Sequence, residues 1–339
     1  MALYDLHILD AVQFNSLVGM DDIIPGVEEV YRLYSSGNAG VFPILNREFD
    51  PGRVDMDIKA GYMDGSGIYG LKILGWNRDN PQLLGVPALA GLIVVMDTVR
   101  QQPVGILEAS PVTNLRTGAA GALAARTFAR GESEKAVIVG AGAQGRAQLM
   151  GLSRVLPNLR RVDLFDVHEE TARKMASDVS PLYEKLQIVA GRFDQLEDCV
   201  RQTDILVTCT PSKAAFVEKG WFKRGAHINA IGADIPGKQE FTAEALASVD
   251  RVFGDSRAQV TVKGESQHAV GRGLIAAEAV TEIGEVLNGT KPGRTSPDEI
   301  TLFDATGMAL QDLVSARIAF ARAKERGTGT IVKMEQEPI

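Results

Sequence analysis

An apolar run followed by three closely spaced glycines constrains this chain more than any other feature. The stretch Ala136-Val-Ile-Val-Gly140-Ala-Gly142-Ala-Gln-Gly145 has the spacing Gly-x-Gly-x-x-Gly directly after a strand-like segment. The first glycine of such a pattern turns the chain from strand to helix, the second admits a pyrophosphate, and the third lets helix and strand pack closely. The pattern predicts a dinucleotide site. The residues expected to contact the cofactor there are Gly140, Gly142, Ala143, Gln144 and Gly145.

The expected nucleotide follows from the acid that ends the next strand-like run. Arg161-Val-Asp-Leu-Phe-Asp166 places a carboxylate about twenty residues after the third glycine, where the ribose-binding acid of such folds belongs. A carboxylate accepts hydrogen bonds from a ribose hydroxyl but repels a 2′-phosphate, which usually needs an arginine. Asp166 therefore favours NAD(H) over NADP(H). The alternative is that Asp166 only starts the loop and caps the next helix.

Helix and strand patterns alternate from residue 118 onward, which predicts a doubly wound parallel sheet, a Rossmann domain spanning residues 118–309. The strands expected in this sheet cover residues 136–139, 162–165, 188–190, 205–208, 227–231, 251–253 and 300–303.

The first hundred residues have a different, mixed pattern. Helices are expected within residues 5–17 and over 22–34, followed by strands over 67–75, 88–97 and 104–107. A helix over 310–324 follows the last Rossmann strand and is expected to return to the first domain. The fold class is therefore α/β, with a Rossmann domain and a discontinuous α+β domain made of residues 1–117 and 310–339.

Composition narrows the partners. Thirty-six basic and 43 acidic residues give a net charge of −7 with no basic tract, so nucleic acid is not expected to bind. The longest apolar stretch, residues 86–96, is too short for a bilayer, and the N-terminus has no basic region typical of export signals, so no membrane association is expected. The two cysteines cannot build a disulfide framework, which favours a cytoplasmic protein. The four histidines are scattered and the cysteines lack metal-ligand spacing, so no metal site is expected.

Four further segments resemble one known family. They are Gly70-Leu-Lys72, Leu115-Arg-Thr-Gly-Ala-Ala-Gly121, Asn229-Ala-Ile-Gly-Ala-Asp-Ile-Pro-Gly-Lys-Gln-Glu240 and Phe303-Asp-Ala-Thr-Gly-Met-Ala-Leu-Gln-Asp312. In order and spacing, and with the glycine fingerprint between the second and third, they resemble the ornithine cyclodeaminase/µ-crystallin family over nearly the whole chain. Within the family, the sequences of these segments are most similar to those of the archaeal-type alanine dehydrogenases.

The resemblance implies roles for two residues. Lys72 is similar to the lysine that meets the substrate carboxylate and the carbonyl or imine, where a fixed ammonium stabilises developing negative charge. Asp234 is similar to the catalytic carboxylate of the family, placed at the carboxyl end of a Rossmann strand, where it can take and return protons. The structural alternatives are a surface lysine at a strand end and an Asx-type turn before Pro236-Gly237.

The resemblance also implies further contacts with the cofactor and the substrate. Arg116 and Thr117 are similar to residues that reach the cofactor phosphates, and Arg116 is also a candidate on the substrate side. Thr210, Pro211 and Ser212 are similar to the loop beside the nicotinamide. These residues could instead be an N-terminal flank of an alanine-rich helix and a turn that caps the next helix.

The chain departs from the family pattern in one place. Typical members carry an arginine and then a Met-Pro pair ahead of Gly-Leu-Lys, and that arginine contacts the substrate carboxylate, whereas no arginine aligns here. Lys59 and Arg53 are the candidates to replace it. A strand pair joined by the turn Asp64-Gly-Ser-Gly67 would bring Lys59 near Lys72, with the register deciding between the two candidates.

The resemblance implies an NAD-dependent oxidoreductase. Such an enzyme transfers hydride between nicotinamide and the alpha carbon of a small L-amino acid or its imine, as an alanine dehydrogenase or imine reductase does. The first alternative is an ornithine or lysine cyclodeaminase, which releases ammonia without net redox change. The second is a µ-crystallin-like protein that binds nucleotide without turnover. The resemblance also implies a homodimer formed through the first domain, which would bind the substrate.

Overall fold

The computed structural model describes residues 2–335, which form two compact units. One unit contains residues 2–116 and 308–335, and the other runs over Thr117–Gly307. The first boundary lies inside helix α4 (Ala109–Phe128), and the second directly precedes α12 (Ala309–Arg326). Both lie within two residues of the boundaries expected from sequence. No helix in the described residues is long and apolar enough to cross a membrane.

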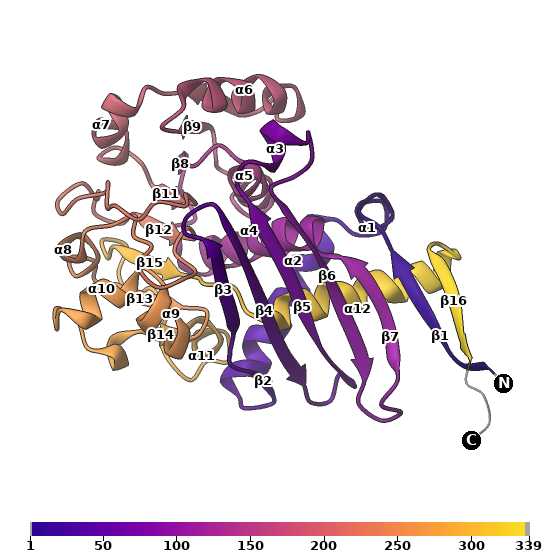
Figure 1. The fold of residues 1–339 in the computed structure, drawn as a ribbon. Coiled ribbons are helices and arrows are strands. Elements are labelled where there is room, and N and C mark those ends of the chain that lie inside the picture. The colour runs from indigo at the N-terminus through magenta and orange to yellow at the C-terminus, as the bar shows by residue number, and fades with distance from the viewer. Residues whose placement is uncertain (1, 336–339) are drawn as a thin grey trace. The chain divides into compact units, whose positions relative to one another are not determined.

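The second unit is built on an all-parallel sheet, which confirms the expected Rossmann architecture (Figure 1). Its strand order is β10-β9-β8-β11-β12-β15-β13-β14. The order reverses between β8 and β11, and open sheets of this kind bind ligands beyond the carboxyl ends of the strands at that point. The strands are β8 (Lys135–Val139), β9 (Arg161–Phe165), β10 (Gln187–Ala190), β11 (Ile205–Thr208), β12 (His227–Ala230), β13 (Arg251–Gly254), β14 (Thr281–Glu282) and β15 (Thr301–Asp304).

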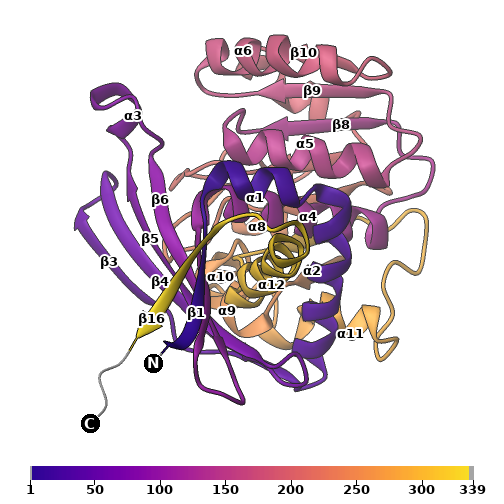
Figure 2. The same cartoon turned by 90° about the vertical axis from the view of Figure 1, so that its right-hand side faces the viewer.

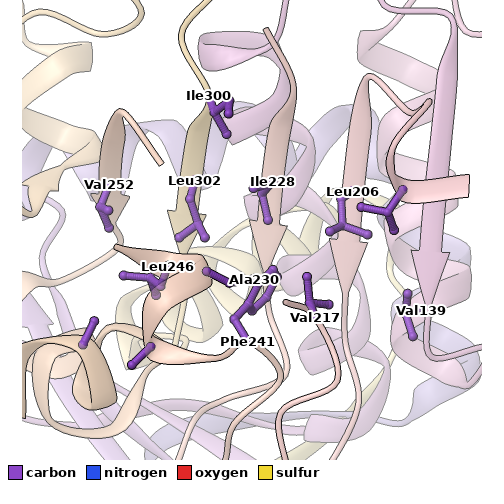
Figure 3. Packing of buried hydrophobic residues seen from close by; sticks show 14 of the residues in the cluster. Val139, Leu206, Val217, Ile228, Ala230, Phe241, Leu246, Val252, Ile300 and Leu302 are labelled. Carbon is purple, nitrogen blue, oxygen red and sulfur yellow. The ribbon is translucent and has the colours of Figure 1, made fainter. Parts of the chain in front are cut away.

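The core of this unit explains why its strands are continuous apolar runs. A parallel sheet is covered on both faces, so neighbouring residues of a strand are all buried. Figure 3 shows Leu206, Ile228 and Leu302 from three adjacent strands beside Phe241 and Leu246. The covering segments include α5 (Ala143–Val155), α6 (Glu169–Val179), α7 (Leu196–Val200), α8 (Ala243–Leu246), α9 (Arg257–Lys263), α10 (Ser266–Gly271) and α11 (Ile283–Leu287).

The first unit contains a mixed sheet with the order β16-β1-β7-β6-β5-β4-β2, to which β3 adds by pairing with β4. Within this sheet, only the pairing of β1 with β7 is parallel among the described strands. The strands are β1 (Ala2–Leu9), β2 (Ala39–Val41), β3 (Leu45–Asp50), β4 (Val54–Met63), β5 (Ile68–Asn77), β6 (Leu89–Asp97), β7 (Pro103–Glu108) and β16 (Thr330–Glu335). The other helices here are α1 (Ala11–Leu17), α2 (Met20–Ser35) and α3 (Asn80–Leu83).

Helix α12 packs against this sheet, and Figure 2 looks nearly along its axis with the sheet curving past it. Gly70 of β5 makes the close approach possible. A Cβ atom there would lie 2.8 Å from a side-chain atom of Leu313 and 2.1 Å from the carbonyl oxygen of Val94. Any side chain at position 70 would therefore push α12 and β5 apart. The glycine of the Gly70-Leu-Lys72 segment thus brings α12 close to the strand that carries Lys72.

Two elements differ from the sequence-based expectations. Residues 2–9 form strand β1, and the helix expected within residues 5–17 is limited to α1, where the Asp10 side chain accepts from the Gln13 amide at 2.8 Å. Pairing with β7 and β16 outweighs the local helical pattern. Helix α4 begins at Ala109, ahead of residue 118, where the alternation of helix and strand patterns was expected to begin; Pro111 lies in its first turn, where proline is tolerated.

Candidate active site

The β4–β5 hairpin places two candidate lysines directly opposite each other. Met63 pairs with Ile68 at the turn, and Lys59 pairs with Lys72 further along, so the predicted strand pair is confirmed. Directly opposed residues of an antiparallel pair share one face of the sheet. Both lysines are buried, with relative exposures of 5% and 1%. The hairpin therefore holds two ammonium groups in one buried neighbourhood.

Asp312, in the first turn of α12, neutralises part of this positive charge. Its Oδ2 lies 2.9 Å from the Lys72 Nζ, and its Oδ1 accepts a hydrogen bond of 3.1 Å from the Arg116 Nε. The Lys72 Nζ also donates to the Thr113 hydroxyl at 3.4 Å. A carboxylate is stabilised further in the first turn of a helix, where the helix dipole is positive. Asp312 thus bridges two cations that come from different elements.

Gln311 fixes the orientation of Arg116. The Arg116 Nη1 donates to the Gln311 Oε1 at 3.1 Å, and the Gln311 Nε2 donates to the Tyr31 hydroxyl at 2.8 Å. The Gln311 Oε1 also accepts the Met308 amide at 2.9 Å. These contacts attach Arg116 to the start of α12, beside the substrate candidates. Its expected contact with cofactor phosphates stays a prediction.

We call Lys59, Lys72 and Arg116, with Asp57 and Asp312, the cation cluster. The Lys59 Nζ lies 3.7 Å from the Asp57 Oδ2, so the cluster joins three cationic side chains to two carboxylates. Burial lowers the pKa of Lys72 to about 8, with Asp312 opposing and Arg116 and Lys59 adding to the shift. Burial alone would raise the pKa of Asp312, but Lys72 and Arg116 hold it below its ordinary value. Three buried cations in one neighbourhood suit the carboxylate of a ligand.

Arg53 lies outside the cation cluster. It stands in the turn between β3 and β4, and its side chain keeps 50% of its exposure. Its guanidinium pairs with Asp50 at 2.9 Å and with Asp79 at 2.8 Å. The register therefore brings Lys59, and not Arg53, to Lys72.

The glycine fingerprint has the geometry that its spacing predicts. Gly140, directly after β8, has a φ of +106°, and a Cβ there would lie 2.8 Å from the Cys209 carbonyl oxygen. Gly142 caps α5 without a side-chain hydrogen bond, and a Cβ there would meet no atom within 4 Å. A Cβ on Gly145 would lie 2.1 Å from the Gly140 oxygen. The turn is thus tight on the inside and open at the helix N-terminus, with Ala143 and Gln144 in its first turn.

Asp166 connects the end of β9 with the glycine loop. Its Oδ2 accepts the Ala141 amide at 3.0 Å, and its Oδ1 accepts the His168 amide at 2.9 Å. His168 is the N-cap residue of α6. Asp166 therefore organises the loop before α6, as the alternative predicted, and also stands beside the fingerprint, where a ribose-binding acid belongs.

The loops after β11 and β12 contain the remaining candidates of this unit. The Thr210 amide and hydroxyl both donate to the Glu240 Oε1 at 2.7 Å, and the Gly232 amide donates to the Glu240 Oε2 at 3.1 Å. Asp234 follows Gly232 by two residues, keeps 39% of its side-chain exposure and lies 2.6 Å from the Lys238 Nζ. Among the other candidates, Pro211 and Ser212 continue the Thr210 loop, and the Thr117 carbonyl accepts the Gln148 Nε2 at 3.0 Å.

Several residues that the structure places among these candidates have no role that the sequence predicts. Asp312 and Glu240 are the last residues of two segments that carry the family resemblance, and Lys238 lies in one of them. Their position in those segments was the available signal. Their partners Lys72 and Thr210 are far away in sequence, so spacing alone could not identify the contacts.

Comparison with known proteins gives a consistent result. The model of the ornithine cyclodeaminase/mu-crystallin family matches residues 5–327. The chain is 37% identical to the alanine dehydrogenase of Archaeoglobus fulgidus over 327 residues, which cover 96% of this chain and 98% of the relative. An archaeal alanine dehydrogenase dimer with bound NAD has a TM-score of 0.90 at 35% identity, covering 98% of this chain and 100% of that one. The Delta(1)-pyrroline-2-carboxylate reductase of Thermococcus litoralis, in complex with NADH and L-proline, has a TM-score of 0.90 at 26% identity, covering 96% and 100%.

Proposed function

This chain belongs to the ornithine cyclodeaminase/mu-crystallin family, and we propose that it is an NAD-dependent oxidoreductase acting on a small L-amino acid or its imine. The observation that carries the proposal is the cation cluster, which gathers three buried cationic side chains in one neighbourhood and so suits a carboxylate substrate. The similar alanine dehydrogenase and pyrroline-2-carboxylate reductase, with their bound NAD and NADH, support the redox class.

In this proposal Lys72 and Lys59 bind the substrate carboxylate. An amino acid brings an anion that loses its hydration on binding, and leaving it unpaired would be costly. The Lys72 ammonium would also lie near the substrate carbon that bears nitrogen. There it would stabilise the negative charge that develops on the carbonyl or imine group. The Asp312 carboxylate holds the Lys72 ammonium in place at 2.9 Å. Arg116 in turn fixes that carboxylate through a contact of 3.1 Å.

The second unit would hold the cofactor. The open position at Gly142 and the tight positions at Gly140 and Gly145 fit a pyrophosphate at the N-terminus of α5. Bound NAD(H) supplies the hydride acceptor or donor for the reaction. The carboxylate of Asp166 favours NAD(H) over NADP(H) by repelling a 2′-phosphate. The further cofactor contacts that we propose are Ala143, Gln144, Arg116, Thr117, Thr210, Pro211 and Ser212.

Asp234 would transfer the protons. Oxidation of an amino acid requires the nitrogen to lose protons, and hydrolysis of the imine requires an activated water. A partly exposed carboxylate in the loop after β12 is suited to both steps. The Lys238 ammonium, 2.6 Å from the Asp234 Oδ1, would hold the carboxylate in one position.

The charge of the cluster disfavours a cyclodeaminase. That reaction needs a diamino acid, whose second ammonium would enter a neighbourhood that already contains three buried cations. An amino acid with a neutral side chain adds no such repulsion. We therefore propose a reaction with net redox change, and a homodimer by analogy with the dimeric archaeal relative.

The test is to incubate the protein with NAD⁺ and a panel of L-amino acids while following both NADH and ammonia. An amino-acid dehydrogenase forms NADH and ammonia in equal amounts, and an imine reductase acting on proline-like amino acids forms NADH alone. Ammonia without NADH would identify a cyclodeaminase. Tight NADH binding without any product would identify a nucleotide-binding protein and contradict the proposal.

A further inference from the structure

Three buried carboxylates in the second unit have no part in the proposed proton transfer. They are Glu240, Glu265 and Asp304, with exposures of 0%, 2% and 0%. Glu240 follows the β12 loop, Glu265 is the N-cap residue of α10, and Asp304 ends β15. We call these three residues the carboxylate ladder.

Each carboxylate of the ladder binds the backbone at the next one. Asp304 accepts the Glu265 amide at 3.1 Å, the Ser266 amide at 2.8 Å and the Ser266 hydroxyl at 2.7 Å. Glu265 accepts the Glu240 amide at 2.6 Å and the Phe241 amide at 3.2 Å. The ladder is therefore a continuous series of contacts from the end of β15 to Glu240.

Glu240 ends the series on two separate loops. One of its carboxylate oxygens accepts the amide and hydroxyl of Thr210 after β11, and the other accepts the amide of Gly232 after β12. Gly232 has no space for a side chain, since a Cβ there would lie 2.4 Å from the Thr210 carbonyl oxygen and 2.5 Å from the Glu240 carboxyl carbon. The two loops and the carboxylate are thus in direct contact.

This arrangement is costly to bury. Burial raises the pKa of Glu240 and raises the pKa of Asp304 to about 7. Burial and the neighbouring charges of Glu240 and Asp304 together raise the pKa of Glu265 well above its ordinary range. Their oxygens accept hydrogen bonds from backbone amides and hydroxyls, and no group of three His, Cys, Asp or Glu side chains within residues 2–335 has the arrangement of a metal site. The ladder therefore serves to fix the backbone segments whose amides its carboxylates accept.

We propose that Glu240 is a positioning residue that sets the spacing between the Thr210 loop and the Gly232–Asp234 segment, with Glu265 and Asp304 fixing Glu240 in turn. The inference rests on the proposed function, in which the first loop lies beside the nicotinamide and the second carries the proton-transferring carboxylate. Reaction rates depend steeply on such spacing, because a misplacement of about 1 Å can cost roughly 100-fold.

A carboxylate suits this position better than an amide. Donors converge on both oxygens of Glu240, the Thr210 amide and hydroxyl on one and the Gly232 amide on the other. A glutamine accepts hydrogen bonds only at its oxygen and would turn an NH₂ group toward the remaining donor. Glu240→Gln keeps the shape and releases one of the two loops.

The decisive test compares Glu240→Gln with Asp204→Asn. Asp204 is also a buried carboxylate that accepts two backbone amides, those of Glu134 at 3.0 Å and Lys135 at 3.1 Å, but it precedes β11 at the amino end of the same strand. Thermal unfolding, kcat and KM, and the fluorescence of bound NADH are measured for both variants and the parent.

Both variants are expected to lose thermal stability. Only Glu240→Gln is expected to lower kcat, by about 10-fold to 100-fold, with KM changed less and with an altered emission of bound NADH. Thr210→Val, which removes a single donor, is expected to lower kcat in the same direction by a few fold, and it covers the case in which Glu240→Gln does not fold. Glu265→Gln combined with Glu240→Gln is expected to lower kcat no further than Glu240→Gln alone, because Glu265 acts through Glu240.

Equal losses of kcat in Glu240→Gln and Asp204→Asn, or a kcat of Glu240→Gln within about twofold of the parent, would overturn the positioning role. The NADH signal separates this failure from failure of the proposed function. A parent protein that binds no NADH contradicts the proposed function. A parent that binds NADH with an emission that Glu240→Gln leaves unchanged contradicts only the ladder proposal.

Discussion

The two units bury charge in different ways. In the cation cluster of the first unit, Lys72 and Arg116 are compensated mainly by another side chain, the carboxylate of Asp312. In the carboxylate ladder of the second unit, Glu240 and Glu265 are compensated by backbone amides. A side-chain ion can change partner when a ligand arrives, whereas a backbone amide cannot move without moving its loop. The first arrangement is suited to binding an ion and the second to fixing positions.

The directions of the pKa shifts express the same difference. In the cation cluster, burial lowers the pKa of Lys72 to about 8, and Lys72 and Arg116 lower that of Asp312 against the effect of burial. In the ladder, burial raises the pKa of Glu240 and Glu265. The cluster is held together by attraction between opposite charges, and the ladder tolerates its charges at a cost.

The largest expected effect on turnover is that of Asp234→Asn. This substitution removes the proposed proton transfer and leaves the three residues of the carboxylate ladder unchanged. Turnover should fall by roughly 100-fold to 10,000-fold, because an amide keeps the shape but accepts no proton. Binding of NADH and thermal unfolding should be unchanged, as measured by fluorescence titration and calorimetry. Asp298→Asn, at an exposed position of the same unit, is the control. More than about half of the parental turnover in Asp234→Asn would show that Asp234 has no catalytic role.

The next effect concerns the nucleotide. Asp166 should make NADH bind more tightly than NADPH by about 5-fold to 150-fold, equivalent to roughly 1 to 3 kcal/mol of repulsion and lost pairing. Asp166→Ser should narrow this ratio in fluorescence titrations, because it removes the charge. Equal affinities of the parent for the two nucleotides would refute this role of Asp166.

The third effect compares two cations of the first unit. Lys59→Ala should raise KM for the amino acid by at least about tenfold, or roughly 1.4 kcal/mol, with NADH affinity unchanged. Arg53→Ala is the matched control, since Arg53 pairs with Asp50 and Asp79 away from the cluster. If only Arg53→Ala raises KM, Arg53 rather than Lys59 binds the substrate carboxylate.

The smallest effect is a pH dependence. Because burial lowers the pKa of Lys72 to about 8, binding of pyruvate to the protein–NADH complex should weaken about twofold between pH 7 and pH 8 and about tenfold per unit above that. The same shift makes Lys72 favour folding more as pH rises from about 8 to its ordinary 10.5, since the unfolded chain then binds the extra proton. Lys72→Met should bind pyruvate weakly without a break near pH 8. A parental profile that stays flat up to pH 10 would show that the charge of Lys72 is not used.

The sequence predicted what short-range patterns determine. The three glycines give the turn from β8 to α5, and the Asp64–Gly67 turn gives the hairpin that pairs Lys59 with Lys72. Both depend on residues that are close in the chain.

The missing parts depend on distant residues. Asp312 reaches Lys72 only because Gly70 lets α12 approach β5, and a close approach between elements of such separation leaves no periodic signal. Residues 5–9 of β1 fell within the range where a helix was expected, and the strand was missed because its partners β7 and β16 lie about 100 and 320 residues further along the chain. Glu240 is one acid among many until the fold shows its contacts with Thr210 and Gly232.

The central claim is that the cation cluster binds the carboxylate of the substrate, and a comparison of pyruvate with its neutral amide tests it most directly. Dissociation constants of both ligands from the protein–NADH complex are measured for the parent, Lys59→Met and Lys72→Met. We expect the parent to prefer pyruvate by at least about 100-fold and each variant to reduce this preference to about tenfold or less. A preference that stays the same in both variants, with the two ligands weakened equally, would contradict the claim.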